Sequence, residues 1–449
     1  MAPTPLPSTP AAGGRHRKPR QRRLGGRRAG VVAGAVPVAV AVFASPSAFA
    51  AGRDGAGAQA ASATVKDDGA DQRIAGNLNV RVDDPRLGPE VSGVVLDAKS
   101  DKVIWGHNAS TALMPASNAK LFTAATALTV LGPDHRFTTK VTYTNGTLTL
   151  VGGGDRMLTT ADLKALAETA VTTLEARGVE TVRVRVDDSL FPAPTLANGW
   201  RPDYYPEEVA PVRALVVDGH SVLDTSLDAG QVFASQLTAA GIGVEGEVGR
   251  GRAGRAEETL GRHRSPELST VVKRMLKVSD NNIAETLLRM SALGAGRPAT
   301  FEGGTATVRK VLGERYGVPL AGVQLYDGSG LSRADRIPAT ALAEVLDVAT
   351  DHRQTLGAVI DGLPVAGEAG STLGPEWGRF DDPHSLCAVG KVSAKTGTLT
   401  GAIALSGVTR GEDGRIRVFS FVENGATAGP ADIKDAMDGL AATVNGCWA

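Results

Sequence analysis

Apolar residues in the chain follow first a strand period and then a helix period. Residues 91–108 form an apolar run, a polar turn and a second run, which predicts a β-hairpin. Residues 114–132 have apolar positions three or four residues apart and end in Gly132, which predicts a helix. The positions that set this helical spacing are Leu121, Phe122, Ala125, Leu128 and Leu131.

The middle of the chain has a different pattern. Residues 138–155 flank an Asn-Gly pair, which predicts a second hairpin, and residues 160–178 predict an amphipathic helix that begins at a threonine and ends at a glycine. A predicted strand over 179–191 and a predicted helix over 230–242 follow. We therefore expect an inserted α+β domain over residues 139–261.

The C-terminal part returns to long apolar strands. Residues 391–410 and 414–425 predict two or three antiparallel strands, and residues 430–446 predict an amphipathic helix with a proline near its start. With the first hairpin, these strands can form one antiparallel sheet flanked by helices. The expected fold class is α/β (α+β), with a main domain formed by residues 74–138 and 262–449.

The first 50 residues combine a basic stretch with an apolar one. Eight of them are Lys or Arg and none is Asp or Glu, and the apolar run 29–43 precedes Ala48-Phe49-Ala50. This order is typical of a secretory signal peptide cleaved near Ala50, followed by a flexible linker over residues 51–73. The alternative is an uncleaved membrane anchor, although the run is short for a membrane span. Arginine pairs leave the general and the twin-arginine export routes both open.

Charge and cysteine content limit the partners and cofactors. The chain has 48 basic and 48 acidic residues; without the basic residues of the first 50 positions, 40 face 48, a formal charge of −8. Such a chain is a poor partner for nucleic acid, and no stable protein partner is implied. In an exported chain, Cys387 and Cys447 are compatible with one disulfide, the alternative being two unrelated thiols. Because no Cys/His cluster has metal-ligand spacing, we expect neither a metal nor another cofactor.

Three short motifs occur in order along the chain. They are Ser117-Asn118-Ala119-Lys120, Ser279-Asp280-Asn281 and Lys395-Thr396-Gly397-Thr398. Ser-x-x-Lys alone is a weak signal in a long chain. The ordered set is the signature of penicillin-recognising serine enzymes.

Ser117 and Lys120 are the predicted nucleophile and base. Ser117 opens a predicted helix, where unpaired backbone N–H groups favour an oxyanion, and Lys120 lies on the same face one turn later. A serine hydroxyl needs a base to become a nucleophile. Lys120 can be that base if burial or a second cation, such as Lys395, lowers its pKa. The alternative is a serine helix cap followed by a solvated lysine.

The second motif precedes a predicted amphipathic helix. We expect Ser279 to pass a proton from the base to the leaving amine and Asn281 to hold the amide carbonyl of the substrate. The alternative is an Asx cap for that helix. Tyr143-Thr144-Asn145 has the Tyr-x-Asn form that replaces Ser-x-Asn in some related enzymes, but it runs into a hairpin turn and we interpret it as a strand end.

The third motif lies on a predicted strand. Gly397 indicates close approach of a ligand to the backbone. Thr396 and Thr398 offer hydroxyls to a substrate carboxylate, to which Lys395 adds charge. The backbone N–H of Thr398 can complete an oxyanion hole with that of Ser117. The alternative is an ordinary edge strand that contains a lysine.

The chain resembles the D-alanyl-D-alanine carboxypeptidase/endopeptidase family, the class C low-molecular-mass penicillin-binding proteins. The similar blocks are MPASNAKLFTAATAL, LVGGGD, KVSDNNIAETLL, YDGSGLSR and AKTGT, and together they span about residues 75–440. The resemblance implies a transpeptidase/β-lactamase-like domain with an insertion between the first two motifs. It also implies a serine-type carboxypeptidase, with a possible second activity as a DD-endopeptidase, that acts on peptidoglycan stem peptides and is inhibited by β-lactams.

The resemblance extends to a substrate pocket. In that family, an Asp and an Arg hold the charged amino-carboxylate end of a diaminopimelate side chain, which implies Asp203 and Arg333 here. The alternative is that Asp203 caps a turn and Arg333 makes a structural ion pair. The sequence departs from the family pattern in two ways: the segment between Ser117 and Ser279 is short, and Arg156 stands where the family usually has Pro.

Other functions compete with the carboxypeptidase. A β-lactamase shares the acylation machinery, but no Glu-x-x-Leu-Asn element provides a class A deacylating base. A non-catalytic penicillin sensor or cell-wall-binding module has no need of an intact proton relay. A Ser-His-Asp hydrolase is disfavoured, because no Gly-x-Ser-x-Gly turn surrounds Ser117.

Overall fold

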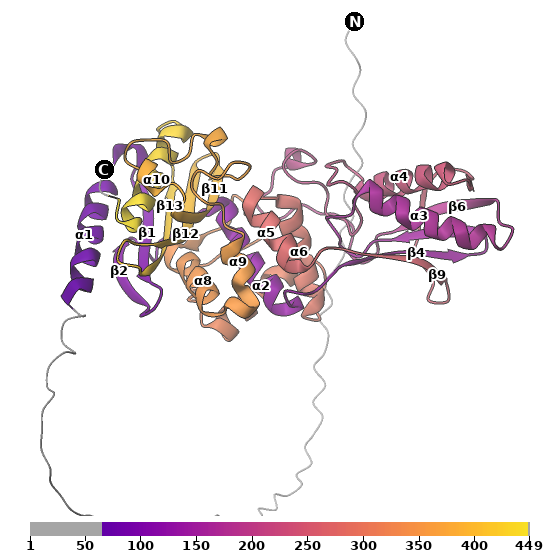
Figure 1. Cartoon of the computed structure of the whole chain (residues 1–449), viewed down its shortest axis with the longest axis horizontal. Helices are drawn as coiled ribbons and strands as arrows, with labels where there is room; N and C mark the ends of the chain where they lie inside the picture. Colours follow the sequence, from indigo (N-terminus) through magenta and orange to yellow (C-terminus); the bar gives the residue numbers. More distant parts are fainter. Residues whose placement is uncertain (1–64, 448–449) are drawn as a thin grey trace, which may run out of the picture. The chain divides into compact units, whose positions relative to one another are not determined.

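The computed structural model describes residues 65–447, and its main feature is one antiparallel sheet between two layers of helices (Figure 1). The sheet has the strand order β11-β12-β13-β1-β2. Its strands are β1 (Glu90–Asp97), β2 (Lys102–His107), β11 (Val392–Leu399), β12 (Ala402–Arg410) and β13 (Ile416–Asn424). The predicted fold class is therefore confirmed, and so are the first hairpin and the C-terminal strands.

Alternate residues of this sheet face two separate cores, as the strand period requires. Val94 and Val418 pack with the helices on one side, among them α2 and α8. Val95 and Phe419 pack on the other side with α1 and α10. The helices of the main domain are α1 (Val65–Arg81), α2 (Lys120–Leu131), α5 (Leu268–Val278), α6 (Asn281–Gly294), α7 (Phe301–Arg309), α8 (Ala339–Asp351), α9 (Arg353–Asp361) and α10 (Pro430–Asn445).

Short elements connect these layers. A two-stranded sheet pairs β3 (Ala112–Leu113) with β10 (Ile337–Pro338). The 3-10 and π turns are η1 (Pro85–Leu87), η2 (Ala116–Ala119), η3 (Pro202–Tyr204), η4 (Lys310–Arg315), η5 (Pro375–Trp377) and η6 (Leu386–Ala388).

The inserted domain is a second sheet covered by two helices that pack on each other (Figure 1). Its strands follow the order β7-β6-β5-β4-β9, and β8 pairs with β6. Asn145 and Gly146 both have positive φ in the predicted turn between β4 and β5, so Tyr143 to Asn145 is a strand end. The elements are β4 (Thr138–Thr144), β5 (Thr147–Val151), α3 (Thr160–Glu175), β6 (Thr181–Asp187), α4 (Thr225–Ala239), β7 (Gly243–Val244), β8 (Gly249–Arg250) and β9 (Glu258–Arg264).

Part of the predicted insertion belongs to the main core. Ala197, Trp200, Tyr204 and Val209 are buried with residues of the main domain rather than with the inserted sheet. The indole N–H of Trp200 donates to the buried carboxylate of Asp327 over 2.6 Å. Sequence period alone could not detect this, because the segment contains only one short helical turn and its packing partner is distant in sequence.

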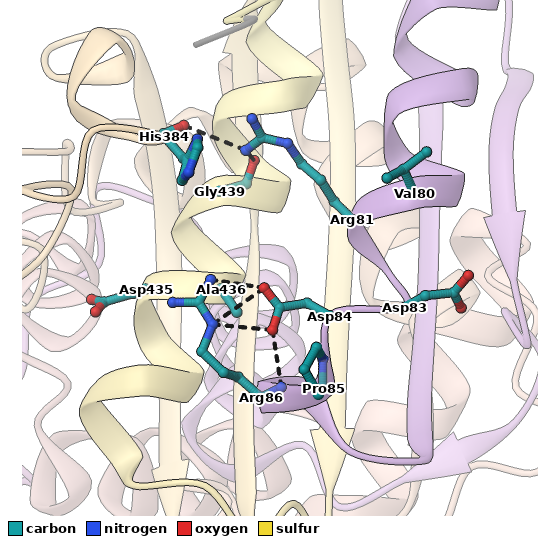
Figure 2. Close-up of a pocket in the computed structure, with 10 residues that line it drawn as sticks. All are labelled: Val80, Arg81, Asp83, Asp84, Pro85, Arg86, His384, Asp435, Ala436 and Gly439. Carbon is teal, nitrogen blue, oxygen red and sulfur yellow. Dashed lines mark hydrogen bonds and ion pairs between the residues drawn. The ribbon is translucent and has the colours of Figure 1, made fainter.

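The predicted linker over residues 51–73 is wrong for its last part, since α1 begins at Val65. Ile74 and Leu78 lie one turn apart on α1 and are almost fully buried. Figure 2 shows Arg81 reaching α10, where its guanidinium donates to the carbonyl of Gly439 over 3.1 Å. The Ala/Gly-rich composition concealed a helix whose stability comes from tertiary packing.

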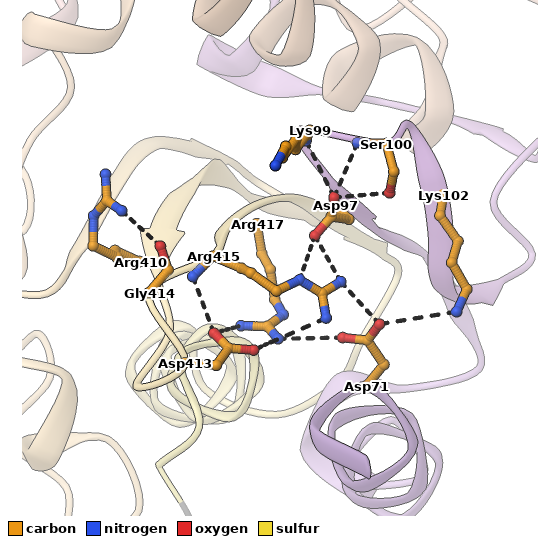
Figure 3. Close-up of polar contacts among 10 residues, drawn as sticks. All are labelled: Asp71, Asp97, Lys99, Ser100, Lys102, Arg410, Asp413, Gly414, Arg415 and Arg417. Carbon is orange, nitrogen blue, oxygen red and sulfur yellow. Dashed lines mark hydrogen bonds and ion pairs between the residues drawn. The ribbon is translucent and has the colours of Figure 1, made fainter. Parts of the chain in front are cut away.

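Buried ion pairs fix the same helix to the sheet (Figure 3). Asp71 on α1 accepts from Arg415 over 3.0 Å and from Arg417 over 3.2 Å. Arg417 is only 1% exposed, so Asp71 and Asp413 compensate a buried charge. These contacts explain why part of the segment expected to be a linker forms a helix that packs on the main domain.

Cys387 and Cys447 form a disulfide in the structure, with their Cα atoms 6.1 Å apart. The bond joins η6, just before β11, to the residues that follow α10. No helix among residues 65–447 is long and apolar enough to cross a membrane. The predicted signal peptide over residues 1–50 lies outside the described residues.

Candidate active site

Ser117 lies in the 3-10 turn η2, directly before α2. The preceding residue, Ala116, has φ of 46°, a left-handed conformation that non-glycine residues rarely adopt. Lys120 is the first residue of α2, so its side chain returns toward the turn. The expected helix start is thus displaced by one short turn, and the pairing of serine and lysine is retained.

The amine of Lys120 lies at the centre of three polar contacts. Its Nζ is 2.8 Å from Ser117 Oγ, 2.7 Å from Asn281 Oδ1 and 2.7 Å from the carbonyl oxygen of Ser329. Lys120 is fully buried. In the neutral amine, two N–H bonds serve the two carbonyl oxygens, which leaves the lone pair for the hydroxyl proton of Ser117.

Burial lowers the pKa of Lys120 to about 8, although Asp327 and Glu285 act in the opposite direction. We expected either burial or a second cation, such as Lys395, to depress this pKa, and burial is the cause. Lys395 is affected in turn, because burial and repulsion from Lys120 lower its pKa well below its ordinary value. Both amines therefore release a proton more readily than an exposed lysine does.

Ser279 and Asn281 lie on either side of a helix boundary. Ser279 follows α5 with φ of 61°, and Asp280 caps α6 by accepting from the backbone N–H of Ile283 over 2.9 Å. Because Asp280 provides the cap, its two neighbours can point into the site. Asn281 bridges Lys120 and the carbonyl oxygen of Glu208, to which its Nδ2 donates over 2.8 Å.

Lys395 connects the third motif to the second. Its Nζ is 2.9 Å from Ser279 Oγ and 2.7 Å from the carbonyl oxygen of Thr396. The side chain is completely buried. The amine of Lys395 therefore binds Ser279 directly. It does not point to a substrate carboxylate, although the sequence had led us to expect that contact.

Gly397 is a point of close approach, as predicted, but the backbone that approaches it belongs to the nucleophile turn. A Cβ at Gly397 would lie 2.7 Å from the carbonyl oxygen of Pro115 and 2.8 Å from Asn118 Nδ2. Since β11 is the edge strand of the sheet, half of its backbone groups point away from β12. Thr398, the next residue of β11, lines the same cavity as Ser117.

The three motifs surround a cavity of about 230 Å³. Sequence reasoning found four of the residues that line it and missed the other four, which lie on a loop and on α10. Thr372, one of those missed, accepts a hydrogen bond from the hydroxyl of Thr396 over 2.7 Å. The lining residues are Ser117, Ser279, Thr372, Trp377, Arg379, Thr396, Thr398 and Lys434.

A second cavity, of about 350 Å³, adjoins the first and shares Thr398 with it. Asp203 and Arg333 both line this cavity, together with Arg201 and Glu207. Asp203 forms an exposed ion pair with Arg201, and Arg333 donates to the carbonyl oxygen of Thr400 over 3.0 Å. The structure thus brings the two predicted residues to one pocket, although it pairs neither with the other.

Two buried carboxylates, Glu285 and Asp327, bind the backbone of the turn next to Lys120, and the sequence did not predict them. Glu285 accepts from the backbone N–H groups of Gly328 and Ser329, and burial raises its pKa to about 7. Asp327 accepts from the N–H groups of Gly330 and Ser332 over 2.7 Å each. These contacts fix the turn that contains Ser329. The carbonyl oxygen of Ser329 accepts the hydrogen bond from Lys120.

Sequence comparison identifies relatives over nearly the whole described chain. Residues 74–223 and 219–444 match the profile of the D-Ala-D-Ala carboxypeptidase 3 (S13) family. A carboxypeptidase DacB of Mycolicibacterium smegmatis is 34% identical over 394 residues, which cover 83% of this chain and 84% of that protein. A D-alanyl-D-alanine carboxypeptidase of Actinomadura sp. is 30% identical over 456 residues, covering 80% of this chain and 83% of that protein.

Structural comparison agrees with the fold. The crystal structure of penicillin binding protein 4 from Haemophilus influenzae superposes with a TM-score of 0.69 at 23% identity, and covers 83% of this chain and 98% of that one. At this identity the similarity concerns the arrangement of the elements alone. Among residues 65–447, no cluster of three or more His, Cys, Asp or Glu side chains could hold a metal ion.

Proposed function

Because the chain belongs to the D-Ala-D-Ala carboxypeptidase 3 (S13) family, we propose that it hydrolyses the terminal D-Ala–D-Ala bond of peptidoglycan stem peptides. The reaction proceeds through an acyl-enzyme on Ser117, and β-lactams inhibit it by acylating the same residue. The observation that carries this proposal is the 2.8 Å contact between Ser117 Oγ and the buried amine of Lys120.

Acylation begins with transfer of the Ser117 proton to Lys120. Oγ of Ser117 forms a bond to the carbonyl carbon of the substrate, and the negative charge that develops on the carbonyl oxygen is met by the backbone N–H groups of Ser117 and Thr398. The oxygens of Asn281 and Ser329 hold Lys120 in place for this transfer. Their two carbonyls also stabilise the ammonium group once it forms.

Collapse of the intermediate breaks the carbon–nitrogen bond of the substrate. The leaving amine needs a proton, and Ser279 is suited to deliver its own because its hydroxyl lies between the cavity and Lys395. The proton that Lys120 took from Ser117 then replaces the one that Ser279 gave, so Lys120 is neutral again. D-Ala then departs. A water molecule attacks the acyl group and gives one proton to Lys120. The bond between the acyl carbon and Ser117 Oγ then breaks, and Lys120 passes that proton to Oγ, which restores the hydroxyl.

The second cavity suits the far end of the stem peptide. The free end of a diaminopimelate side chain carries one ammonium and one carboxylate, and Asp203 and Arg333 offer the complementary charges. Arg201 adds a second guanidinium that Asp203 already contacts. We assign Asp203 and Arg333 to this end of the substrate, and Thr396, Gly397 and Thr398 to the end that is cleaved.

The substrate lies outside the cytoplasm, so the function requires export. Residues 1–50 have the order of a signal peptide, with cleavage near Ala50. N-terminal sequencing of the protein recovered outside the producing cell tests this part of the proposal. An intact Met1 on the exported protein would refute cleavage.

One experiment separates the proposed activity from its competitors. Purified protein is incubated with a peptide that ends in D-Ala-D-Ala, and released D-Ala is measured beside the hydrolysis of benzylpenicillin. Release of D-Ala with a stable penicillin adduct is the expected result. Rapid penicillin turnover without D-Ala release would indicate a β-lactamase, and a stable adduct without D-Ala release would indicate a sensor. A cross-linked dimeric muropeptide in the same assay measures endopeptidase activity.

A further inference from the structure

The proposed substrate carries a negative charge that the described motifs leave uncompensated. A peptide ending in D-Ala has a free carboxylate two bonds beyond the scissile nitrogen. In a partly closed cavity, such a group needs a cation or several donors to offset its loss of hydration. Two cationic side chains, Arg379 and Lys434, line the catalytic cavity, and two more, Lys120 and Lys395, contact the serines that line it.

Three of these four are already occupied. Lys120 contacts Ser117, Asn281 and Ser329, and Lys395 contacts Ser279 and Thr396. Both amines are fully buried, and burial lowers the pKa of each. A group that exchanges protons during the reaction is a poor permanent counter-charge.

Arg379 is neutralised by a carboxylate on α10. Its Nε and Nη2 donate to the two oxygens of Asp438 over 2.9 and 2.5 Å, and Asp438 also accepts from the backbone N–H of Phe380. The ion pair is buried, with exposed side-chain fractions of 4% and 0%. Its function is to fix the loop that bears Thr372 and Trp377 against α10.

Lys434 differs from the other three. It lies one helical turn before Asp438 on α10, lines the cavity with Ser117 and Thr398, and is half-buried. It makes no hydrogen bond or ion pair with residues 65–447. Burial and repulsion from Arg379 lower the pKa of Lys434, and Asp438 acts in the opposite direction. Arg379 and Asp438 are paired with each other.

We propose that Lys434 binds the terminal carboxylate of the substrate and so makes the enzyme specific for peptides that end in a free acid. The inference rests on the proposed function and deepens it. The hydroxyls of Thr372 and Thr398 complete the carboxylate site: Thr396 donates to Thr372, which leaves the Thr372 hydroxyl free to donate in turn. In this arrangement the third motif supplies hydroxyls and the oxyanion hole, and α10 supplies the charge.

Paired substrates test the role of Lys434. The first pair is an acylated peptide ending in D-Ala-D-Ala and the same peptide with a C-terminal amide; the second is benzylpenicillin and its methyl ester. Wild type, Lys434→Gln, Lys434→Arg and Lys164→Gln are compared for kcat/KM with the peptides and for the acylation rate of Ser117 with the lactams. Lys164 is the matched control, because it is an exposed lysine on α3 that pairs with Glu168 on the same helix.

Lys434→Gln should lower kcat/KM for the acid peptide and acylation by benzylpenicillin about 10- to 100-fold, the range for loss of a hydrogen bond to a charged group. The amide and the methyl ester should react at the wild-type rate, and Lys434→Arg should restore most of the preference. Equal losses for acid and neutral substrates would show a structural role and overturn the inference, as would full activity of Lys434→Gln. If the wild type neither releases D-Ala nor is acylated, the proposed function itself fails, a result distinct from either.

Discussion

The amine of Lys395 lies 2.9 Å from the hydroxyl of Ser279, although 116 residues separate them in the chain. The contact joins an edge strand of the main sheet to the turn between α5 and α6. It provides a route by which a proton can move between the base and the leaving group without entering bulk water. The chemistry we propose depends on this contact as much as on the Ser117–Lys120 pair.

Replacement of Lys120 should slow the acylation of Ser117. Lys120→Ala should slow acylation by benzylpenicillin about 10²- to 10⁴-fold, because positioned proton transfer contributes that much. Intact-protein mass spectrometry measures the rate, and peptide mapping should locate the adduct on Ser117. Lys164→Ala, on the exposed face of α3, should acylate at the wild-type rate. Undiminished labelling of Ser117→Ala would refute the nucleophile.

Acylation should depend on pH in the direction set by a neutral base. Burial lowers the pKa of Lys120 to about 8, and the neutral amine is the active form. The acylation rate should therefore rise about tenfold per pH unit below 8 and level off above it. Stopped-flow acylation by a lactam that does not titrate between pH 6 and 10 measures the profile. A rate that falls as the pH rises through 8 would mean that the charged lysine is required.

A methyl group at Gly397 should disturb the nucleophile rather than the fold. Gly397→Ala would bring a Cβ within 2.7 Å of the carbonyl oxygen of Pro115, so the turn that carries Ser117 must move. A displacement of about 1 Å can cost about 10²-fold in rate, which is the loss expected for acylation. Gly249→Ala is the control, because nothing lies within 4 Å of its added Cβ. Equal activity of the two variants would contradict the close approach.

The second cavity predicts a preference for a zwitterionic side chain. Peptides with and without a free diaminopimelate-like end should differ in kcat/KM on the wild type, and Asp203→Ala or Arg333→Ala should reduce the difference. Charged contacts of this kind are worth about 2–4 kcal/mol, or tens- to several-hundred-fold. Arg201→Ala tests whether Asp203 must first be held by its neighbour. If both variants keep the wild-type preference, the pocket lies elsewhere.

Loss of the disulfide should reduce stability without removing chemistry. The bond closes a loop with a sequence separation of 60 residues, worth at most about 4 kcal/mol on the chain-entropy model. Replacing Cys387 and Cys447 together by Ser should lower the midpoint of urea unfolding, while the double variant is still acylated at 25 °C. Titration of free thiols in the exported wild type should find none. Two free thiols would refute the bond.

The sequence alone predicted those parts of the site that depend on local spacing. Lys120 follows Ser117 by three residues, and a helix turn converts that spacing into contact. The motif order likewise predicted that Ser279, Asn281 and Lys395 would meet. The strand and helix periods predicted the main sheet and its helices, because those periods also depend on residues close together in the sequence.

What the sequence did not predict depends on packing between distant segments. Lys434 and Thr372 belong to no motif, and they reach the cavity because Arg379 and Asp438 fix a loop against α10. The first helix was hidden because its composition is that of a linker, and its stability comes from contacts such as Asp71 to Arg417. Periodicity contains no information about such partners.

The strand order of the main sheet also determines when the active site can exist during synthesis. β1 pairs with β13 along its full length, from Glu90 opposite Asn424 to Asp97 opposite Arg417. More than 300 residues separate these partners in the chain, so the first hairpin waits while almost the entire polypeptide is made, for about 20 to 60 s at ordinary ribosome speeds. A nascent or truncated chain that ends before β11 contains Ser117 and Lys120. It lacks Lys395 and three of the five strands of the main sheet, β11, β12 and β13. Such chains should be unable to react with penicillin, so covalent labelling by a β-lactam reports on completed molecules.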